Sequence, residues 1–215
     1  MNLMTDAPIE RMDSTSQPGA AIGVALPHES AELHVSGEAA YTDDLPELAG
    51  TLHVALGLSR HAHARILSLD LEAVRAAPGV VAVLTAADIP GENNCGPVLH
   101  DDPILADGTV SYLGQPVFAV VATSRELARQ AAALAKSGDV VRYEPLEAVL
   151  TARAARDRQQ YVLPPLHLVR GDPAAKIAAA THRLTGEFEV GGQEQFYLEG
   201  QIAYAVPKEG AGMLV

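Results

Sequence analysis

The sequence has 215 residues, 48% of them apolar and only 4% aromatic, and its 27 acidic and 15 basic side chains give a formal net charge of −12. This composition is too apolar and too weakly charged for a disordered chain. Its acidity argues against a nucleic-acid partner, because phosphates are neutralised by Lys and Arg. The single cysteine, Cys95, excludes a disulfide framework and any zinc or iron–sulfur site built from this chain's own thiolates.

No segment predicts a membrane partner. The longest apolar runs, 79–84 and 117–122, are far shorter than the ~20 residues of a membrane-spanning helix. The first six residues lack a basic region followed by an apolar core, so no signal peptide is expected. The sequence therefore predicts a soluble, cytoplasmic protein.

The first part of the chain changes character near residue 33. Residues 1–32 have no periodic apolar pattern and contain three prolines, which predicts a mobile N-terminal arm. A strand-like pattern begins at about residue 33. It is clearest at 51–58, where Leu52 and every second residue after it to Leu58 are apolar and share one face of a strand.

Two further strands with short helices follow. Residues 64–71 read as a strand, and Asp70 can cap a short helix over 71–76. The continuous apolar run 80–84 predicts a strand that is buried on both faces. A single helical turn is expected at 85–88.

After a polar loop over 91–109, strands are predicted at 110–113 and 116–122. Thr123 and Glu126 match a capping box, with Thr123 as the cap of the helix that follows. One more strand is predicted at 140–144. Short strands interrupted by helices, without strict β-α-β spacing, indicate an α+β domain.

The last quarter of the chain looks like the opening of a second domain. A short helix should begin at Pro173 with Asp172 as its cap, and strands are predicted at 184–190, at 201–206 and from 212. So few strands do not make a core. The pattern divides the chain into a mobile arm (1–32), an α+β domain (33–148), an exposed linker (149–165) and an incomplete second domain (166–215).

Two groups of residues could bind a cation. His61 and His63 would share one face of an extended segment, with His53 or Asp70 as a third ligand, but hydrogen-bonded turn histidines explain the pattern better. The adjacent carboxylates of Asp43–Asp44 are better explained as an acidic turn.

Carboxylates near the C-terminus are the other candidates. Glu194 and Glu199 could form an acid–base pair, which would suit a small hydrolase, although spacing alone supports this weakly. Glu187 and Glu189 share the expected wet face of one strand. Cys95 lies in a polar loop with no histidine at a telling spacing, and no glycine-rich phosphate loop follows any strand.

Four motifs occur in the order of a known family. They are His34–Pro46, Ser68–Ile89 (continuing through Pro90), Gly114–Pro116 and Gly191–Glu199. Together they resemble the opening of the molybdopterin-binding large subunit in the xanthine dehydrogenase and aldehyde oxidase family, and the bacterial two-subunit form is the most similar. The resemblance runs over nearly all of residues 28–207.

The resemblance implies an α/β hammerhead domain over about 33–148, followed by the start of a molybdenum-cofactor-binding domain. It implies an enzyme that hydroxylates hypoxanthine and xanthine to urate with oxygen from water. Electrons would pass through 2Fe–2S clusters and FAD to NAD. The clusters and flavin would lie on a small partner subunit, in a heterotetramer of two large and two small subunits.

The resemblance assigns no catalytic, cofactor-binding or metal-binding residue to this chain, because the family's glycine-rich loop and catalytic glutamate lie downstream of Val215. The family pattern also has His where this chain has Gln195, which cannot carry a proton at neutral pH. The chain alone is expected to be inactive. The alternatives are an aldehyde oxidoreductase subunit and a non-catalytic hammerhead module for assembly.

Overall fold

A computed structural model describes residues 25–197 and 199–215. Its contacts divide the chain into two units, which are treated separately below. The larger unit spans Glu47–Gly191, and the smaller unit joins the residues up to Pro46 with Gly192–Val215.

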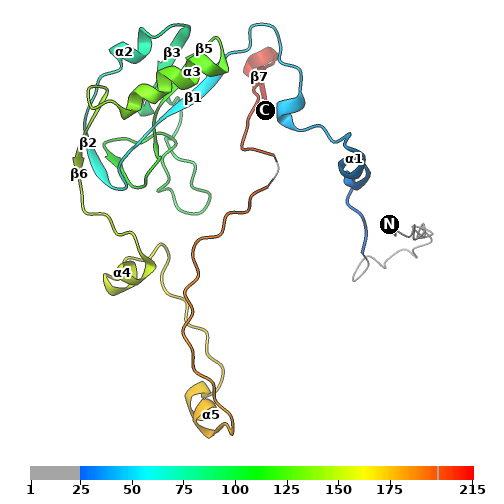
Figure 1. The fold of residues 1–215 in the computed structure, drawn as a ribbon, viewed down its shortest axis with the longest axis vertical. Coiled ribbons are helices and arrows are strands. Elements are labelled where there is room, and N and C mark those ends of the chain that lie inside the picture. Colours follow the sequence, from blue (N-terminus) through cyan, green and yellow to red (C-terminus); the bar gives the residue numbers. More distant parts are fainter. Residues whose placement is uncertain (1–24, 198) are drawn as a thin grey trace, which may run out of the picture. The chain divides into compact units, whose positions relative to one another are not determined.

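The larger unit is built on two antiparallel sheets of three strands each (Figure 1). In the first sheet the central strand is β5 (Pro116–Ala122), flanked by β1 (His53–Leu58) and β3 (Val80–Leu84). In the second sheet the central strand is β2 (Ala64–Leu69), flanked by β4 (Thr109–Val110) and β6 (Val141–Pro145). The mixture of antiparallel sheets and short helices confirms the predicted α+β class.

Helix α3 (Arg125–Ala132) continues into the 3₁₀ turn η3 (Ala133–Lys136) and packs against β1 and β5 (Figure 1). Its buried side chains are all alanines, so the helix backbone can approach the sheet closely. Two short helical elements flank β3 in the chain, α2 (Glu72–Arg75) before it and η2 (Ala86–Asp88) after it. The core cluster joins both sheets with α2 and α3.

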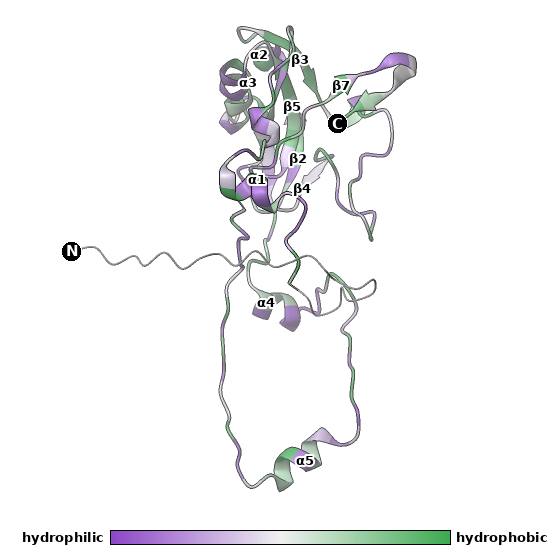
Figure 2. Ribbon diagram, turned by 90° about the vertical axis from the view of Figure 1, so that its right-hand side faces the viewer, coloured by the Kyte–Doolittle hydropathy of each residue, from purple (hydrophilic) through white to green (hydrophobic). Residues whose placement is uncertain are grey.

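On its other face, the flanking strand β1 of the first sheet exposes apolar side chains, whereas the central strand β5 is mostly buried on both faces. Val54 and Leu56 of β1 are 62% and 46% exposed, whereas Ala55 between them packs against the core. The face that the alternating leucines predicted therefore points away from α3. Figure 2 colours β3 and β5 of this sheet green, as hydrophobic.

The prediction that residues 80–84 form a strand buried on both faces is wrong. The strand exists as β3, but Val81 is 57% exposed and Leu84 is 42% exposed. β3 lies at an edge of its sheet, and the fully apolar strand at the centre is β5. A run of apolar residues gives the strand but not its position in the sheet.

The predicted cap of α3 is displaced by one residue. The Ser124 hydroxyl, and not that of Thr123, accepts a hydrogen bond from the Leu127 amide at 3.3 Å. The Thr123 amide instead donates to the Gly79 carbonyl at 2.9 Å, which keeps Thr123 in the preceding strand connection. The Asp70 carboxylate accepts from the Glu72 amide at 3.1 Å, but the cap of α2 is the next residue, Leu71, so the predicted cap is again displaced by one residue.

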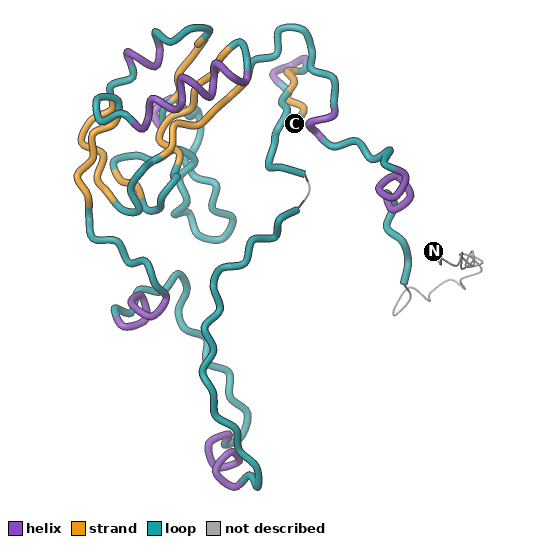
Figure 3. The backbone as a smooth tube through the Cα atoms, in the orientation of Figure 1, coloured by secondary structure: helices purple, strands orange, loops and turns teal. Residues whose placement is uncertain are grey.

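Between β6 and the C-terminal elements the chain is mostly loop (Figure 3). The predicted linker contains an exposed helix, α4 (Ala152–Asp157), which begins after Thr151. Helix α5 (Pro173–Ala179) has the expected Asp172 cap, whose carboxylate accepts from the Ala175 amide at 2.9 Å. The predicted strand at 184–190 is wrong, because this segment has no strand partner and Leu184 and Phe188 are almost fully exposed.

In the smaller unit, the strand-like pattern expected from residue 33 is helical: α1 spans Ala31–Ser36. The remaining elements are short: η1 (Thr42–Asp44), β7 (Val206–Pro207), η4 (Glu209–Ala211) and β8 (Met213–Leu214). The strand predicted at 201–206 is reduced to β7, which pairs with β8 in the last predicted strand. Most of the predicted mobile arm, residues 1–24, lies outside the described residues.

Among the helices of the described residues the longest, α3, has eight residues, so none could cross a bilayer.

Candidate functional site

Two of the motifs that carry the resemblance meet in the smaller unit. The Thr42 amide, in the first motif, donates to Oε1 of Glu199, in the last motif, at 2.7 Å. These residues are 157 positions apart in the chain, and both are half-buried. The hydrogen bond therefore joins two segments that are distant in the sequence, and the charge of the Glu199 carboxylate strengthens it.

A hollow of about 230 Å³ adjoins this hydrogen bond. It is lined by Glu199 and by residues of α1 and the following turn: Ser30, Leu33, His34, Ala39, Ala40 and Tyr41. The rings of His34 and Tyr41 lie 6.0 Å apart between centroids, and the His28 ring lies 5.5 Å from that of His34. The lining offers an imidazole, a phenol and a carboxylate to whatever contacts it.

The structure gives the two members of the proposed acid–base pair separate structural roles, one long-range and one local. The Glu199 carboxylate accepts from Thr42, and the Glu194 carboxylate accepts from the Phe196 amide at 3.5 Å. Both carboxylates accept from backbone amides, Glu194 within its own turn and Glu199 from a distant segment of the chain. A paired catalytic function for them has no support in this geometry.

The other acidic candidates also have structural partners. Asp44 accepts from the Tyr41 amide at 2.9 Å, so the acidic turn predicted for this pair is present as η1. Glu187, on the strand face expected to be wet, pairs with Arg153 at 3.1 Å. Glu189 is exposed, and Cys95 is an exposed thiol that donates to the Asp102 carbonyl.

The three histidines considered as metal ligands, His53, His61 and His63, lie in the larger unit and have different neighbours. His63 donates from Nδ1 to the Glu147 carbonyl at 2.7 Å, and the His61 ring packs on Tyr143 with centroids 4.8 Å apart. His53 faces Glu47 at 3.5 Å. Within the described residues, no group of three or more His, Cys, Asp and Glu side chains could hold a metal ion.

A buried polar cluster beside these histidines was not predicted from the sequence. Gln115 is 2% exposed, and its side-chain oxygen accepts from the Ser111 amide at 2.6 Å. Ser59 is 4% exposed, and its hydroxyl bonds to both the amide and the carbonyl of His61 at 3.0 Å. The Ser59 amide also donates to the Gln115 carbonyl at 2.9 Å. The one signal in the sequence was the Gly114–Pro116 motif.

Tyr143 belongs to the same region and has a perturbed hydroxyl. Burial raises the pKa of Tyr143, and the nearby Ser59 hydroxyl and Arg60 charge offset only part of this effect. The Ser59 hydroxyl is committed to the His61 backbone. Among the described residues, the distances and angles give the buried Tyr143 oxygen no hydrogen-bond partner.

Replacing Tyr143 with phenylalanine should leave stability at pH 7 unchanged or raise it by up to about 1 kcal/mol, because an unsatisfied buried hydroxyl is removed. The folded state holds the phenolic proton more tightly than the unfolded state, whose pKa is near 10.0. This contribution is therefore complete below pH 10 and is lost as the pH rises through the folded-state pKa. Urea midpoints by far-UV circular dichroism at pH 7 and above 10 should show a smaller alkaline loss in Y143F than in the wild type.

Tyr112→Phe is the matched control, because Tyr112 is 48% exposed. An alkaline loss equal in Y143F and Y112F would contradict the assignment to Tyr143.

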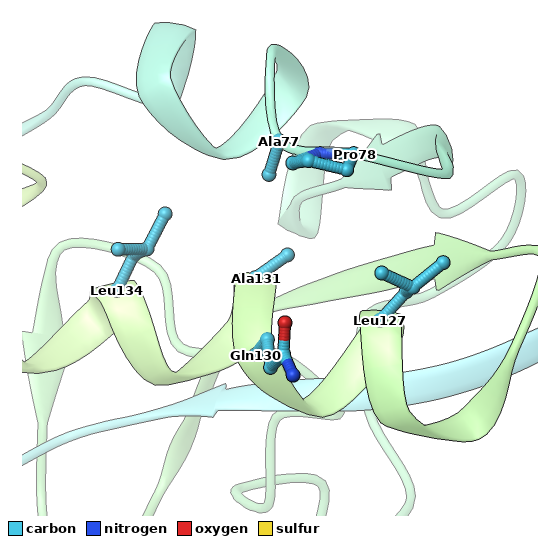
Figure 4. A pocket seen from close by; sticks show the side chains of 6 residues that line it. All are labelled: Ala77, Pro78, Leu127, Gln130, Ala131 and Leu134. Carbon is cyan, nitrogen blue, oxygen red and sulfur yellow. The ribbon is translucent and has the colours of Figure 1, made fainter.

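A second hollow, of about 240 Å³, lies beside α3 in the larger unit (Figure 4). Ala77 and Pro78 face Leu127, Ala131 and Leu134 across it, and Gln130 supplies its polar group. Apart from the Gln130 amide, the side chains that line this hollow are apolar, so it contains no group that could act as a nucleophile, acid or base. It is a gap in the packing between the α2 turn and α3.

Comparison with known proteins agrees with this architecture. Residues 36–147 match the family model described as the aldehyde oxidase and xanthine dehydrogenase a/b hammerhead domain, and residues 155–215 match the molybdopterin cofactor-binding domain. A hammerhead followed by a molybdopterin-binding domain defines the class of molybdopterin-dependent oxidoreductase subunits. The chain belongs to the aldehyde oxidase and xanthine dehydrogenase family.

Among its relatives, xanthine dehydrogenase/oxidase of Gallus gallus is 36% identical over 187 residues, which are 87% of this chain and 13% of that protein. Xanthine dehydrogenase of Oryza sativa is 39% identical over 88% of this chain and 14% of that protein, and aldehyde oxidase 2 of Cavia porcellus is 39% identical over 93% of this chain and 14% of that protein. The chain thus spans about one seventh of the length of these relatives.

Solved structures show the same fold. The aldehyde oxidoreductase of Desulfovibrio gigas superposes with a TM-score of 0.56 at 28% identity, over 72% of this chain and 19% of that chain. Quinoline 2-oxidoreductase of Pseudomonas putida 86 gives 0.55 at 30% identity, over 74% of this chain and 22% of that chain.

Proposed function

We propose that this chain is the N-terminal part of the molybdenum subunit of a xanthine dehydrogenase. The complete enzyme hydroxylates hypoxanthine and xanthine to urate with water as the oxygen source, in purine catabolism, and passes electrons through iron–sulfur clusters and FAD to NAD. The observation that carries the proposal is the 36–39% identity to xanthine dehydrogenases over nearly nine tenths of the chain. The succession of the two matched domains supports it.

In this proposal the hammerhead domain covers 33–148, a linker covers 149–165 and the molybdopterin-binding part begins at 166. The partner is a cytoplasmic small subunit with FAD and 2Fe–2S clusters, in a heterotetramer of two large and two small subunits. The content of one cysteine supports this division, because a cluster needs several thiolates that this chain does not supply.

The molybdopterin would be bound mainly by residues outside this chain. Open space surrounds Gly191 and Gly192, and Phe188 and Phe196 beside them are 93% and 88% exposed. These residues do not form a cradle that fits the cofactor, and no reaction step is assigned to them. In this proposal the chain packs beside the residues that bind the cofactor and contacts the small subunit.

An aldehyde oxidoreductase is the second candidate. Aldehyde oxidase 2 of Cavia porcellus is as similar to this chain as the xanthine dehydrogenase of Oryza sativa, at 39% identity. The identity over these residues does not separate purines from aldehydes as substrates. A non-catalytic assembly module is the remaining alternative.

The test joins the chain to the coding sequence that follows it in its own gene and co-expresses it with an FAD/iron–sulfur subunit in a host that makes molybdopterin. NAD reduction is measured with hypoxanthine, xanthine and benzaldehyde. We expect purine turnover by the complex and none by the 215-residue chain alone. Preference for benzaldehyde would favour the second candidate.

Two further measurements can contradict the proposal. Mass spectrometry for molybdenum should find no metal retained by the bare chain, and retention with hypoxanthine turnover would overturn the assignment of the site to other residues. Capture of the small subunit should weaken when residues 33–148 are deleted, and unchanged capture would exclude the hammerhead as its contact.

A further inference from the structure

The smaller unit contains a segment whose sequence match and structural contacts differ. Residues 36–46 fall within the matched hammerhead domain, yet their contacts group them with 192–215. Residues 31–44, from the start of α1 to the end of η1, are called the strap below. The strap precedes the hammerhead strands in sequence and contacts the last part of the chain in space.

The strap is closed on itself by local contacts. His34 in α1 packs its ring on Tyr41, and the Asp44 carboxylate accepts from the Tyr41 amide. This leaves the amide of Thr42, the first residue of η1, facing outward from its turn. The first amides of a helical turn have no acceptor within it and need one from elsewhere.

Glu199 supplies that acceptor. Its Oε1 lies 2.7 Å from the Thr42 amide nitrogen, and both residues are half-buried although most of their neighbours are exposed. Three residues that line the adjoining hollow, Ser30, Ala39 and Tyr41, are also half-buried. The burial of the strap is thus concentrated at the carboxylate of Glu199.

We propose that Glu199 is a positioning residue that clamps the strap to the molybdopterin-binding segment, so that the strap works as part of that segment. The clamp fixes the chain directly after residues 191–197, a segment that the proposed function places within the molybdopterin-binding part that begins at 166. The functional half of this inference rests on the proposed function. The structural half does not.

The test on the 215-residue chain is amide hydrogen exchange at Thr42, with Glu199→Ala, Glu199→Gln and Glu194→Ala. In E199A the exchange of Thr42 should accelerate roughly 10- to 100-fold, because a charged acceptor is lost. E199Q should retain most of the protection, since its side-chain carbonyl can still accept. E194A should match the wild type, because the Glu194 carboxylate accepts from the Phe196 amide in its own turn.

Unchanged Thr42 exchange in E199A, or equal acceleration in E194A, would overturn the clamp. Far-UV circular dichroism of the same samples should remain unchanged, because the core belongs to the larger unit.

In the assembled enzyme, E199A should lower the molybdenum content per subunit, and E199Q should restore it. Loss of clamping by exchange with full molybdenum content would refute the functional half alone. Absence of purine turnover in the wild-type complex would instead count against the proposed function and leave the exchange result standing.

Discussion

Replacing Phe118 with alanine is expected to lower the free energy of unfolding by about 3–5 kcal/mol, the cost of deleting a large buried aromatic side chain. Phe118 is fully buried at the centre of β5 and belongs to the core cluster of the larger unit. Its ring lies over Gly57 of β1, where an added Cβ would come within 2.3 Å of the ring. Gly57 has no side chain that could move into the space left by the ring.

Urea denaturation followed by far-UV circular dichroism measures this effect, because the chain has no tryptophan. Leu56→Ala is the control. Leu56 precedes Gly57 in β1, and its side chain is on the opposite face of that strand, where the residue is 46% exposed. It should cost roughly 1 kcal/mol or less, in proportion to the little surface it buries. Equal losses in F118A and L56A would mean that the core does not lie between the sheet and α3.

Replacing Gln115 with alanine is expected to cost about 2–4 kcal/mol. The side chain is 2% exposed, and its removal leaves the Ser111 amide without its acceptor and opens a cavity. The Gln115 carbonyl also accepts from the Ser59 amide. Movement of the Gln115 backbone would therefore disturb the buried polar cluster that joins Gln115 and Ser59 to His61. The same denaturation measurement applies.

Gln130→Ala offers a matched control, because this glutamine on α3 donates only to Glu126 within an exposed helix pair. Its loss should stay below about 0.5 kcal/mol. Should Q115A be as stable as Q130A, the buried hydrogen bond to Ser111 would have no structural importance.

The sequence predicted local structure well where a cap or a period was strong. Asp172 caps its helix as expected, and β1, β3 and β5 occur at the predicted apolar runs. The cap of α3 was misplaced by one residue, because Thr123 and Ser124 are both competent caps and the bond from Thr123 to Gly79 decides between them.

The candidate site was predicted less well. Glu199 was singled out for its spacing from Glu194, whereas its partner is an amide 157 residues away. Gln115 was noted only as part of a motif, and nothing in the pattern around it signalled that its amide group would be buried. Side-chain chemistry is visible in the sequence, but the identity of a distant partner is not.

By itself, the amino-acid sequence determined the α+β class, the position of most strands and the family, because these depend on local periodicity, caps and ordered motifs. Only the tertiary structure decided that β5 is central, that β3 is an edge strand and that the leucine face of β1 points away from α3. It also decided that Thr42 and Glu199 meet. These are outcomes of long-range pairing, in which residues far apart compete for the same partners, and a local pattern carries no information on which partner is chosen.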